Sequence, residues 1–98
     1  MPTYVVLMNW TDQGIKTFED SPPRADAGQE EEMAKLGVER REIFWTVGPY
    51  DVVMLCDAPD EESMTAVLLR IGAAGNVRTT TLRAFNREEF ERMAARAR

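Results

Sequence analysis

The fold is decided by residues 43–57, IFWTVGPYDVVMLCD, near the middle of the 98-residue chain. Two apolar runs flank Gly48 and Pro49, and both residue types are typical of tight turns. The pattern predicts an antiparallel hairpin whose second strand covers residues 51–57. Tyr50 and Asp51 raise a second hypothesis, because a phenol and a carboxylate beside a turn also suit acid–base chemistry at a cavity mouth.

The segments on either side of this hairpin complete a repeated order of strand, helix and strand. Residues 3–10 and 77–85 are rich in β-branched and aromatic residues and predict two further strands, while the first hairpin strand begins near residue 38. Two βαβ-like halves joined by a hairpin predict a ferredoxin-like α+β fold, with a four-stranded antiparallel sheet and its crossover helices on one face. We expect a single domain over residues 1–98.

Two helices are predicted between the first strand and the hairpin. Thr11 is a typical N-cap residue, and a short helix follows it. Ser21 is predicted to cap a longer helix with Pro22 at its first position, where the missing N–H is not needed. Gly37 marks the end of that helix, near Leu36.

Two more helices are predicted in the second half of the chain. After Pro59 and Asp60, apolar residues recur at the helical spacing i, i+3, i+4 and i+7; these are Met64, Val67, Leu68 and Ile71. Asn86 and Glu89 are placed to form a capping box at the start of a C-terminal helix. This last helix is an addition to the six elements of the ferredoxin-like order.

Composition argues against several classes of function. The net charge is −5 and acidic residues interrupt the basic C-terminal end, so nucleic-acid binding is not expected. The chain contains no histidine, which removes Ser-His-Asp and Cys-His nucleophile systems and histidine-ligated haem or zinc. An all-carboxylate Mg²⁺ or Ca²⁺ site stays open, but the spacing of a calcium-binding loop is missing. We therefore expect no cofactor and no metal.

The single cysteine and the N-terminus bear on location. Cys56 is the only cysteine, so an intrachain disulfide is excluded, and its place in the middle of a predicted strand favours a small core residue. The N-terminus leads straight into a predicted strand without a signal-peptide pattern, and the longest apolar run is far shorter than the ~20 residues of a membrane span. We expect a soluble, cytoplasmic protein that binds no membrane.

The strands are apolar on both faces. Alternate residues of a strand point to opposite faces, and in residues 3–10 the two sets are Tyr4, Val6, Met8 and Trp10 against Thr3, Val5, Leu7 and Asn9. A sheet that is backed by helices on one side normally leaves its other side polar. We therefore predict that a second copy covers this face in a twofold homodimer. The alternative is that the C-terminal helix folds over the open face of its own sheet.

Three segments in order along nearly the whole chain resemble the GYD family: MPTYVVLMNWTDQGI, FWTVGPYD and GNVRTTTLRAF. Gly48, Tyr50 and Asp51 match its Gly-x-Tyr-Asp signature, with Pro49 in the variable position. The resemblance implies the dimeric α/β-barrel superfamily, in which two ferredoxin-like sheets face each other and enclose a cavity. It implies no single activity, because proteins of similar architecture include cofactor-free monooxygenases, haem-handling enzymes and small-ligand-sensing domains. The absence of an axial histidine disfavours the haem-handling branch.

Aromatic and polar residues at the strand ends are the candidates for a site. Trp10 and Trp45 either wall a ligand cavity or pack in the core or the dimer interface. Asn9 either positions a ligand carbonyl, or ends its strand or caps the next helix. Tyr50 and Asp51 either act at a cavity mouth or hold the turn through hydrogen bonds.

Two arginines of the last predicted strand complete the candidates. Arg78 and Arg83 differ in parity, so they face opposite sides of the sheet. One of them is a candidate to meet an anionic ligand or to pair with Asp51, and the alternative is an ordinary surface or interface ion pair.

Three functions follow from these interpretations. The favoured hypothesis is a homodimeric small-molecule-binding protein with a partly apolar cavity between sheet and helices or at the dimer interface, its ligand-binding residues being Trp10, Trp45, Tyr50, Arg78 and Arg83. The second is a cofactor-independent, monooxygenase-like enzyme in which Asn9, Trp10 and Tyr50 hold an activated phenolic substrate. The third is an interaction module whose whole role is dimerisation.

Overall fold

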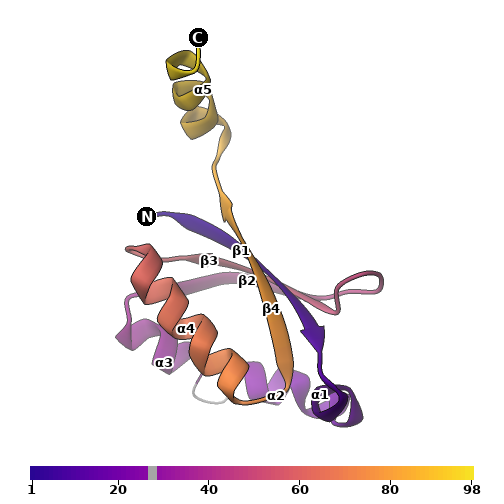
Figure 1. Cartoon of the computed structure of the whole chain (residues 1–98). Coiled ribbons are helices and arrows are strands. Elements are labelled where there is room, and N and C mark those ends of the chain that lie inside the picture. The colour runs from indigo at the N-terminus through magenta and orange to yellow at the C-terminus, as the bar shows by residue number, and fades with distance from the viewer. Residues whose placement is uncertain (27–28) are drawn as a thin grey trace.

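The computed structural model of the chain describes residues 1–26 and 29–98. The elements follow one another as β1 Thr3–Trp10, α1 Asp12–Lys16, a 3₁₀ turn η1 Phe18–Asp20, α2 Ser21–Asp26, α3 Gln29–Lys35, β2 Glu39–Trp45, β3 Val52–Asp57, α4 Glu61–Ala73, β4 Val77–Ala84 and α5 Arg87–Arg96 (Figure 1). The sheet order is β2-β3-β1-β4 with every neighbouring pair antiparallel. This confirms the ferredoxin-like α+β fold with an added C-terminal helix.

The predicted hairpin is present and consists of β2, β3 and the loop between them. The backbone N–H of Thr46 donates to the carbonyl of Asp51 at 2.8 Å and closes the loop. Gly48 has φ +139, a backbone conformation that residues with a side chain rarely adopt. Glycine is therefore required at this position for the turn itself.

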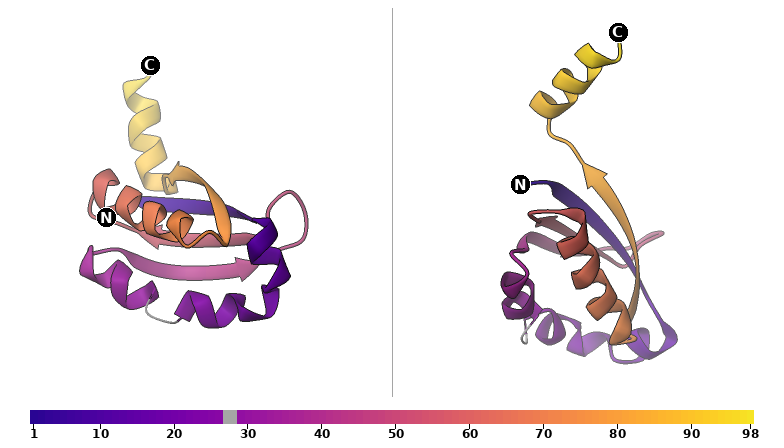
Figure 2. Two further views of the ribbon diagram at one scale, coloured as in Figure 1. Left: turned by 60° about the horizontal axis from the view of Figure 1, so that its bottom comes forward. Right: turned by 60° about the vertical axis from the view of Figure 1, so that its left-hand side comes forward.

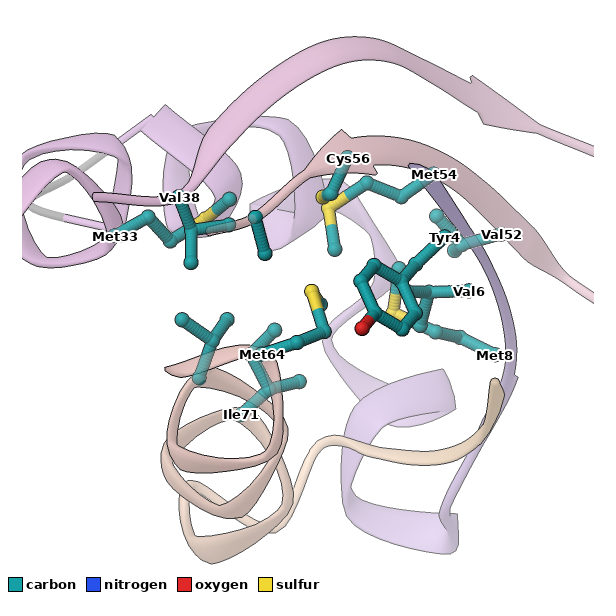
Figure 3. Close-up of a cluster of buried hydrophobic side chains, with 12 residues drawn as sticks. Tyr4, Val6, Met8, Met33, Val38, Val52, Met54, Cys56, Met64 and Ile71 are labelled. Atoms are coloured by element: carbon teal, nitrogen blue, oxygen red, sulfur yellow. The ribbon is translucent and has the colours of Figure 1, made fainter. Parts of the chain in front are cut away.

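The core lies between the sheet and the helices α2, α3 and α4, which all cover one face of the sheet (Figures 1 and 2). Met64, Val67 and Ile71 of α4 are buried, which confirms the amphipathic stripe. Figure 3 shows that Met64 and Ile71 approach the side chains of β1 and β3 across the core. Among the described residues, the largest fully buried side chains are Met33, Met54, Met64, Val6 and Cys56.

The predicted start of the second helix is wrong in one respect. Ser21 has the helical backbone angles φ −59 and ψ −50 and is the first residue of α2, so it is not an N-cap. The 3₁₀ turn η1 leads into α2 directly and leaves no extended residue for capping. The prediction of one helix from Ser21 to about Leu36 includes Ala27 and Gly28, which lie outside the described residues; the described parts are α2 and α3.

The C-terminal helix α5 stands away from the sheet (Figures 1 and 2). Its capping box is confirmed, because Asn86 accepts from the backbone N–H of Glu89 while the Glu89 side chain accepts from the N–H of Asn86. None of its residues is buried. The alternative that α5 covers the open face of its own sheet is therefore wrong. In the part of the chain that the structure describes, no helix has the length and apolar character needed to cross a membrane.

Candidate functional site

The Gly-Pro-Tyr-Asp turn is tied to the end of β1 by three hydrogen bonds. The Asp51 carboxylate accepts from the backbone N–H of Trp10 at 2.9 Å, and the N–H of Asp51 donates to the Met8 carbonyl at 2.8 Å. The Asn9 side-chain amide donates to the carbonyl of Pro49 at 2.7 Å. Asp51 and Asn9 thus direct polar groups at the backbone of the fold, which is what a structural role of the turn requires.

Tyr50 contributes its backbone carbonyl, rather than its ring, to the hydrogen bonds of the turn. Its carbonyl accepts from the Thr46 hydroxyl at 2.6 Å, and its side chain is half-buried. Among the described residues, the pairing of Thr46 with both Tyr50 and Asp51 closes the hairpin loop. The structure brings Asn9, Trp10 and Asp51 together around this loop, where the side chains of Asn9 and Asp51 bind main-chain atoms.

The two tryptophans lie on the helix-covered side of the sheet. Trp10 packs against the core, and its indole N–H is buried without a hydrogen-bond partner in the described part of the chain. Trp45 is 42% exposed, and its indole N–H donates to the Ser21 hydroxyl at 2.9 Å. That bond links β2 to the start of α2.

Arg78 and Arg83 face opposite sides of β4, as their parity predicts. Arg83 pairs in register with Tyr4 on the covered face, where its guanidinium lies 4.3 Å from the centre of the Phe85 ring and donates to the Thr3 carbonyl at 3.3 Å. Arg78 is exposed and pairs in register with Asn9 on the other face. Within residues 1–26 and 29–98, neither arginine forms an ion pair with Asp51.

A cavity of about 440 Å³ lies between the helix layer and the sheet. Its apolar lining comes from all four strands and from the helices α2, α3 and α4, and includes Met8, Met33, Ile43, Val52, Val67, Ile71 and Val77. This volume falls in the range of about 300–1,000 Å³ that is usual for small-molecule sites. None of the candidates Asn9, Trp10, Trp45, Tyr50, Asp51, Arg78 and Arg83 lines it.

Three charged side chains line the same cavity, and sequence reasoning did not single them out. They are Arg24 of α2, Glu32 of α3 and Arg70 of α4. Arg70 forms an ion pair with Glu32, so one salt bridge joins the two helices beside the cavity. The signal available in the sequence was the position of Arg70 directly before Ile71, a residue of the predicted α4 stripe. Its partner Glu32 is 38 positions away, so the stripe did not indicate the pairing.

The open face is the sheet face opposite the helices, and its apolar centre consists of Val5, Leu7, Phe44, Val53, Leu55 and Leu82. The strand registers place Val5 between Leu55 and Leu82, and Val53 between Leu7 and Phe44. Phe44 and Leu82 are about half exposed, at 51% and 49%. No element of the described chain covers this surface (Figure 2).

Polar residues lie at the two ends of the open face. At one end the Asp57 carboxylate accepts from the Thr3 hydroxyl at 2.7 Å and lies 2.8 Å from the Arg41 guanidinium. At the other end Asn9 pairs in register with Arg78. An apolar centre with a polar surround is the arrangement of protein–protein interfaces.

Cys56 belongs to the core and not to a reactive site. The residue is fully buried, and burial raises the pKa of its thiol to about 11, an effect that the nearby Arg40 only partly opposes. A thiol with a raised pKa is a poor nucleophile at neutral pH. The structural interpretation of Cys56 agrees with this surrounding.

Comparison with known proteins matches nearly the whole chain. The family model described as GYD domain matches residues 4–94. The glutamine synthetase and cystathionine beta-lyase binding protein of Thermus thermophilus is 33% identical over 84 residues, which are 86% of this chain and 88% of that protein.

Two solved structures share the fold. A crystal structure of a protein from Thermus thermophilus matches with a TM-score of 0.55 and 27% identity, over 88% of this chain and 95% of that chain. The leucine response regulatory protein of Mycobacterium tuberculosis matches with a TM-score of 0.65 and 21% identity, over 87% of this chain. This chain spans about half of that regulator, at 51% of its length, and the likeness concerns the fold alone.

Proposed function

This chain belongs to the GYD domain family, and from that premise we propose that it is a homodimeric small-molecule-binding protein with one domain over residues 1–98. The observation that carries the proposal is the cavity of about 440 Å³ between the sheet and the helices. A mainly apolar cavity with a few polar groups is the usual form of a small-molecule site.

The composition of the cavity wall supports binding rather than a plain packing defect. Core side chains normally fill the interior to crystal-like density, and a void of this size forfeits many contacts. Met33, Val67 and Ile71 form part of the wall and are almost fully buried. An apolar molecule that fills the space restores those contacts and stabilises the folded chain.

The test uses three probes with the same eight-carbon chain: 1-octanol, octanoate and octylamine. At about a hundred times its Kd, a ligand adds about 2.7 kcal/mol to the free energy of unfolding, which raises the thermal midpoint of a domain this small by roughly 10 °C or more. We expect at least one probe to give such a shift in a thermal scan.

Val67→Phe fills the cavity from α4 and is expected to abolish the shift. Leu69→Phe is the matched control, because Leu69 lies on the same helix, is 70% exposed and does not line the cavity. Ala74→Phe, at the exposed end of α4, is a second blocking variant if Val67→Phe proves unstable. If none of the probes shifts the midpoint, or if the blocking variant and Leu69→Phe show the same shift, the cavity is not a binding site.

The open face supports pairing with a second copy. Its apolar centre is larger than the isolated apolar residues of a typical surface, and contiguous apolar patches of this kind mark interaction sites. The helix α5 of the same chain, which could have covered the open face, has no buried residue. A twofold pairing of identical faces would place each apolar centre on the other and keep the polar ends at the rim.

Light scattering at micromolar concentration tests the dimer. We expect twice the 11.1 kDa of one chain. Leu55→Lys places a charge in the centre of the open face and is expected to give the mass of one chain. Leu69→Lys makes the same change at a 70% exposed site on α4 and leaves the mass doubled. A native mass near one chain contradicts the proposed pairing.

A second candidate function is the binding of another protein. The supporting observation is the 33% identity to a protein named for binding glutamine synthetase and cystathionine beta-lyase. In this chain, Phe90 and Met93 of α5 are 63% and 36% exposed and form part of a stripe that has no partner in the described chain. The test mixes the chain with each purified enzyme from its own organism and measures binding by interferometry. Binding that Phe90→Ser weakens supports an adaptor role; no binding to either enzyme rejects it.

The monooxygenase alternative gains no support from the geometry. Asn9 and Asp51 use their side-chain polar groups to tie the hairpin to β1, and Trp10 and Tyr50 are not among the residues that line the cavity. A catalytic set needs its groups to converge where a substrate can lie. We therefore propose binding and not oxygen chemistry.

A further inference from the structure

The charges at the cavity favour one sign of ligand. Of the residues that line it, Arg24 and Arg70 are positive and Glu32 alone is negative. The remaining lining residues are uncharged, so the described wall carries a net charge of +1. Because the floor is apolar and the charge is confined to a few helix residues, a ligand that suits both parts must itself be amphipathic.

Arg24 is held in place by its own chain. One guanidinium nitrogen, Nη1, donates to the carbonyl of Thr17 at 3.1 Å and to its hydroxyl at 2.9 Å. A guanidinium has five N–H donors, so the donors on Nη2 and Nε are left for a ligand within the described structure. A side chain that is already positioned loses little freedom when it binds.

The salt bridge between Arg70 and Glu32 is weak enough for a ligand to replace. The Arg70 side chain is 66% exposed and that of Glu32 is 38% exposed. Exposed pairs of this kind contribute about 1 kcal/mol or less. A ligand carboxylate that also buries an apolar body can therefore exchange with Glu32 as the partner of Arg70, and can form the paired hydrogen bonds that favour arginine–carboxylate contacts.

On the basis of the proposed small-molecule function, we infer that the ligand is an amphipathic carboxylate. Its apolar body lies among Met33, Val67 and Ile71, and its carboxylate binds Arg24 and Arg70. Binding replaces the Arg70–Glu32 ion pair between α3 and α4, and the ligand carboxylate links α4 to α2 instead. A cationic amphiphile of the same shape is disfavoured, because both arginines repel it.

The three eight-carbon probes test this inference through their order of affinity, measured by titration calorimetry at pH 7. We expect octanoate to bind most tightly, 1-octanol less tightly and octylamine least. Arg70→Gln is expected to weaken octanoate binding by about tenfold or more, because a hydrogen bond to a charged group contributes more than one between neutral groups. The same variant is expected to change 1-octanol binding much less than octanoate binding. Arg92→Gln removes one positive charge from α5, far from the cavity, and is the matched control.

Glu32→Gln gives a result of opposite sign. Removing the competing carboxylate frees Arg70 and is expected to strengthen octanoate binding severalfold, whereas a purely structural salt bridge predicts weaker binding. The inference is overturned if octylamine or 1-octanol binds as tightly as octanoate, or if Glu32→Gln weakens octanoate binding. Either of those results leaves the cavity as a small-molecule site, whereas the absence of binding by all three probes rejects the site as well.

Discussion

Adjacent residues of β3 show that the two faces of one sheet differ in how deeply they are buried. Met54 is fully buried beneath the helices, while the next residue, Leu55, is half-buried on the open face. Both are apolar, and each pairs in register with a valine of β1, Met54 with Val6 and Leu55 with Val5. The difference does not come from residue type: it comes from the two crossover connections, which place their helices on the same face.

This comparison teaches that the apolar character of a strand does not say what will cover it. The covered face finds its partners within the chain, in Met33 of α3 and in Met64 and Ile71 of α4 (Figure 3). The open face has no such partner in the described chain, since α5 stands away from it. A second copy is the cover that we propose.

The largest expected effect is a difference in the free energy of unfolding between a variant of the covered face and a variant of the open face. Met54→Ala removes a fully buried side chain and is expected to lower the free energy of unfolding by about 2–5 kcal/mol at any protein concentration. Leu55→Ala is expected to cost less in dilute solution and more as the concentration rises, because the open face becomes covered only in the dimer. Urea unfolding of both variants at two concentrations measures the difference. Equal, concentration-independent losses contradict the distinction between the faces.

A second prediction concerns the hydrogen bond from the Trp10 N–H to the Asp51 carboxylate, which holds the hairpin to β1. Asp51→Ala leaves the backbone N–H of Trp10 without its acceptor and is expected to cost about 1–3 kcal/mol. Asp51→Asn keeps an acceptor oxygen and is expected to recover most of that loss. The measurement is urea unfolding of the two variants. An unchanged midpoint in Asp51→Ala is evidence against a structural role for the signature aspartate.

A third prediction uses pH to compare the faces. Burial raises the pKa of Cys56 from 9.0 to about 11. The folded state therefore keeps its proton where the unfolded state loses it, so this contribution to stability is complete below pH 9 and declines as the pH rises toward 11. Cys56→Ala is expected to show a shallower decline over that range. Leu55→Cys, added to the Cys56→Ala variant, places a thiol on the open face instead. It is expected to restore only a small part of the decline, because the folded-state pKa of a thiol there is less raised. Equal declines for the thiol at position 55 and the thiol at position 56 contradict the prediction.

The smallest expected effect belongs to α5. Deletion of residues 86–98 is expected to change the free energy of unfolding of the dissociated chain by less than about 0.5 kcal/mol, because no residue of α5 is buried. Circular dichroism during thermal unfolding at low protein concentration measures it. A larger loss that appears only at high concentration means that α5 packs on a second copy, whereas a larger loss at every concentration means that it packs on its own chain.

Sequence reasoning succeeded where a pattern repeats locally. The strand predicted at residues 3–10 is β1, and the spacing of Met64, Val67 and Ile71 identified the buried side of α4. The capping box of Asn86 and Glu89 was predicted from two residues three positions apart. Each of these depends on neighbours within one turn or one strand, and so the chain itself carries the whole signal.

Sequence reasoning failed where the decisive contact is distant. The Ser21 hydroxyl is taken by Trp45, 24 positions away, in place of the capping role predicted for it. Arg24 and Arg70 come to the same cavity from different helices, and no periodicity relates them. The catalytic interpretation of Tyr50 and Asp51 also needed geometry, because the Asp51 carboxylate meets the N–H of Trp10 across 41 positions.

The sequence by itself determined the hairpin, the order of strands and helices, and the fact that the sheet is apolar on both sides, because side-chain alternation and helical spacing are local properties of a chain. Only the tertiary structure decided that one face is covered by α2, α3 and α4, that α5 leaves the other uncovered, and that two arginines and a glutamate line the cavity. Those outcomes depend on how the crossover connections pack in space, where residues far apart in sequence compete for the same partners.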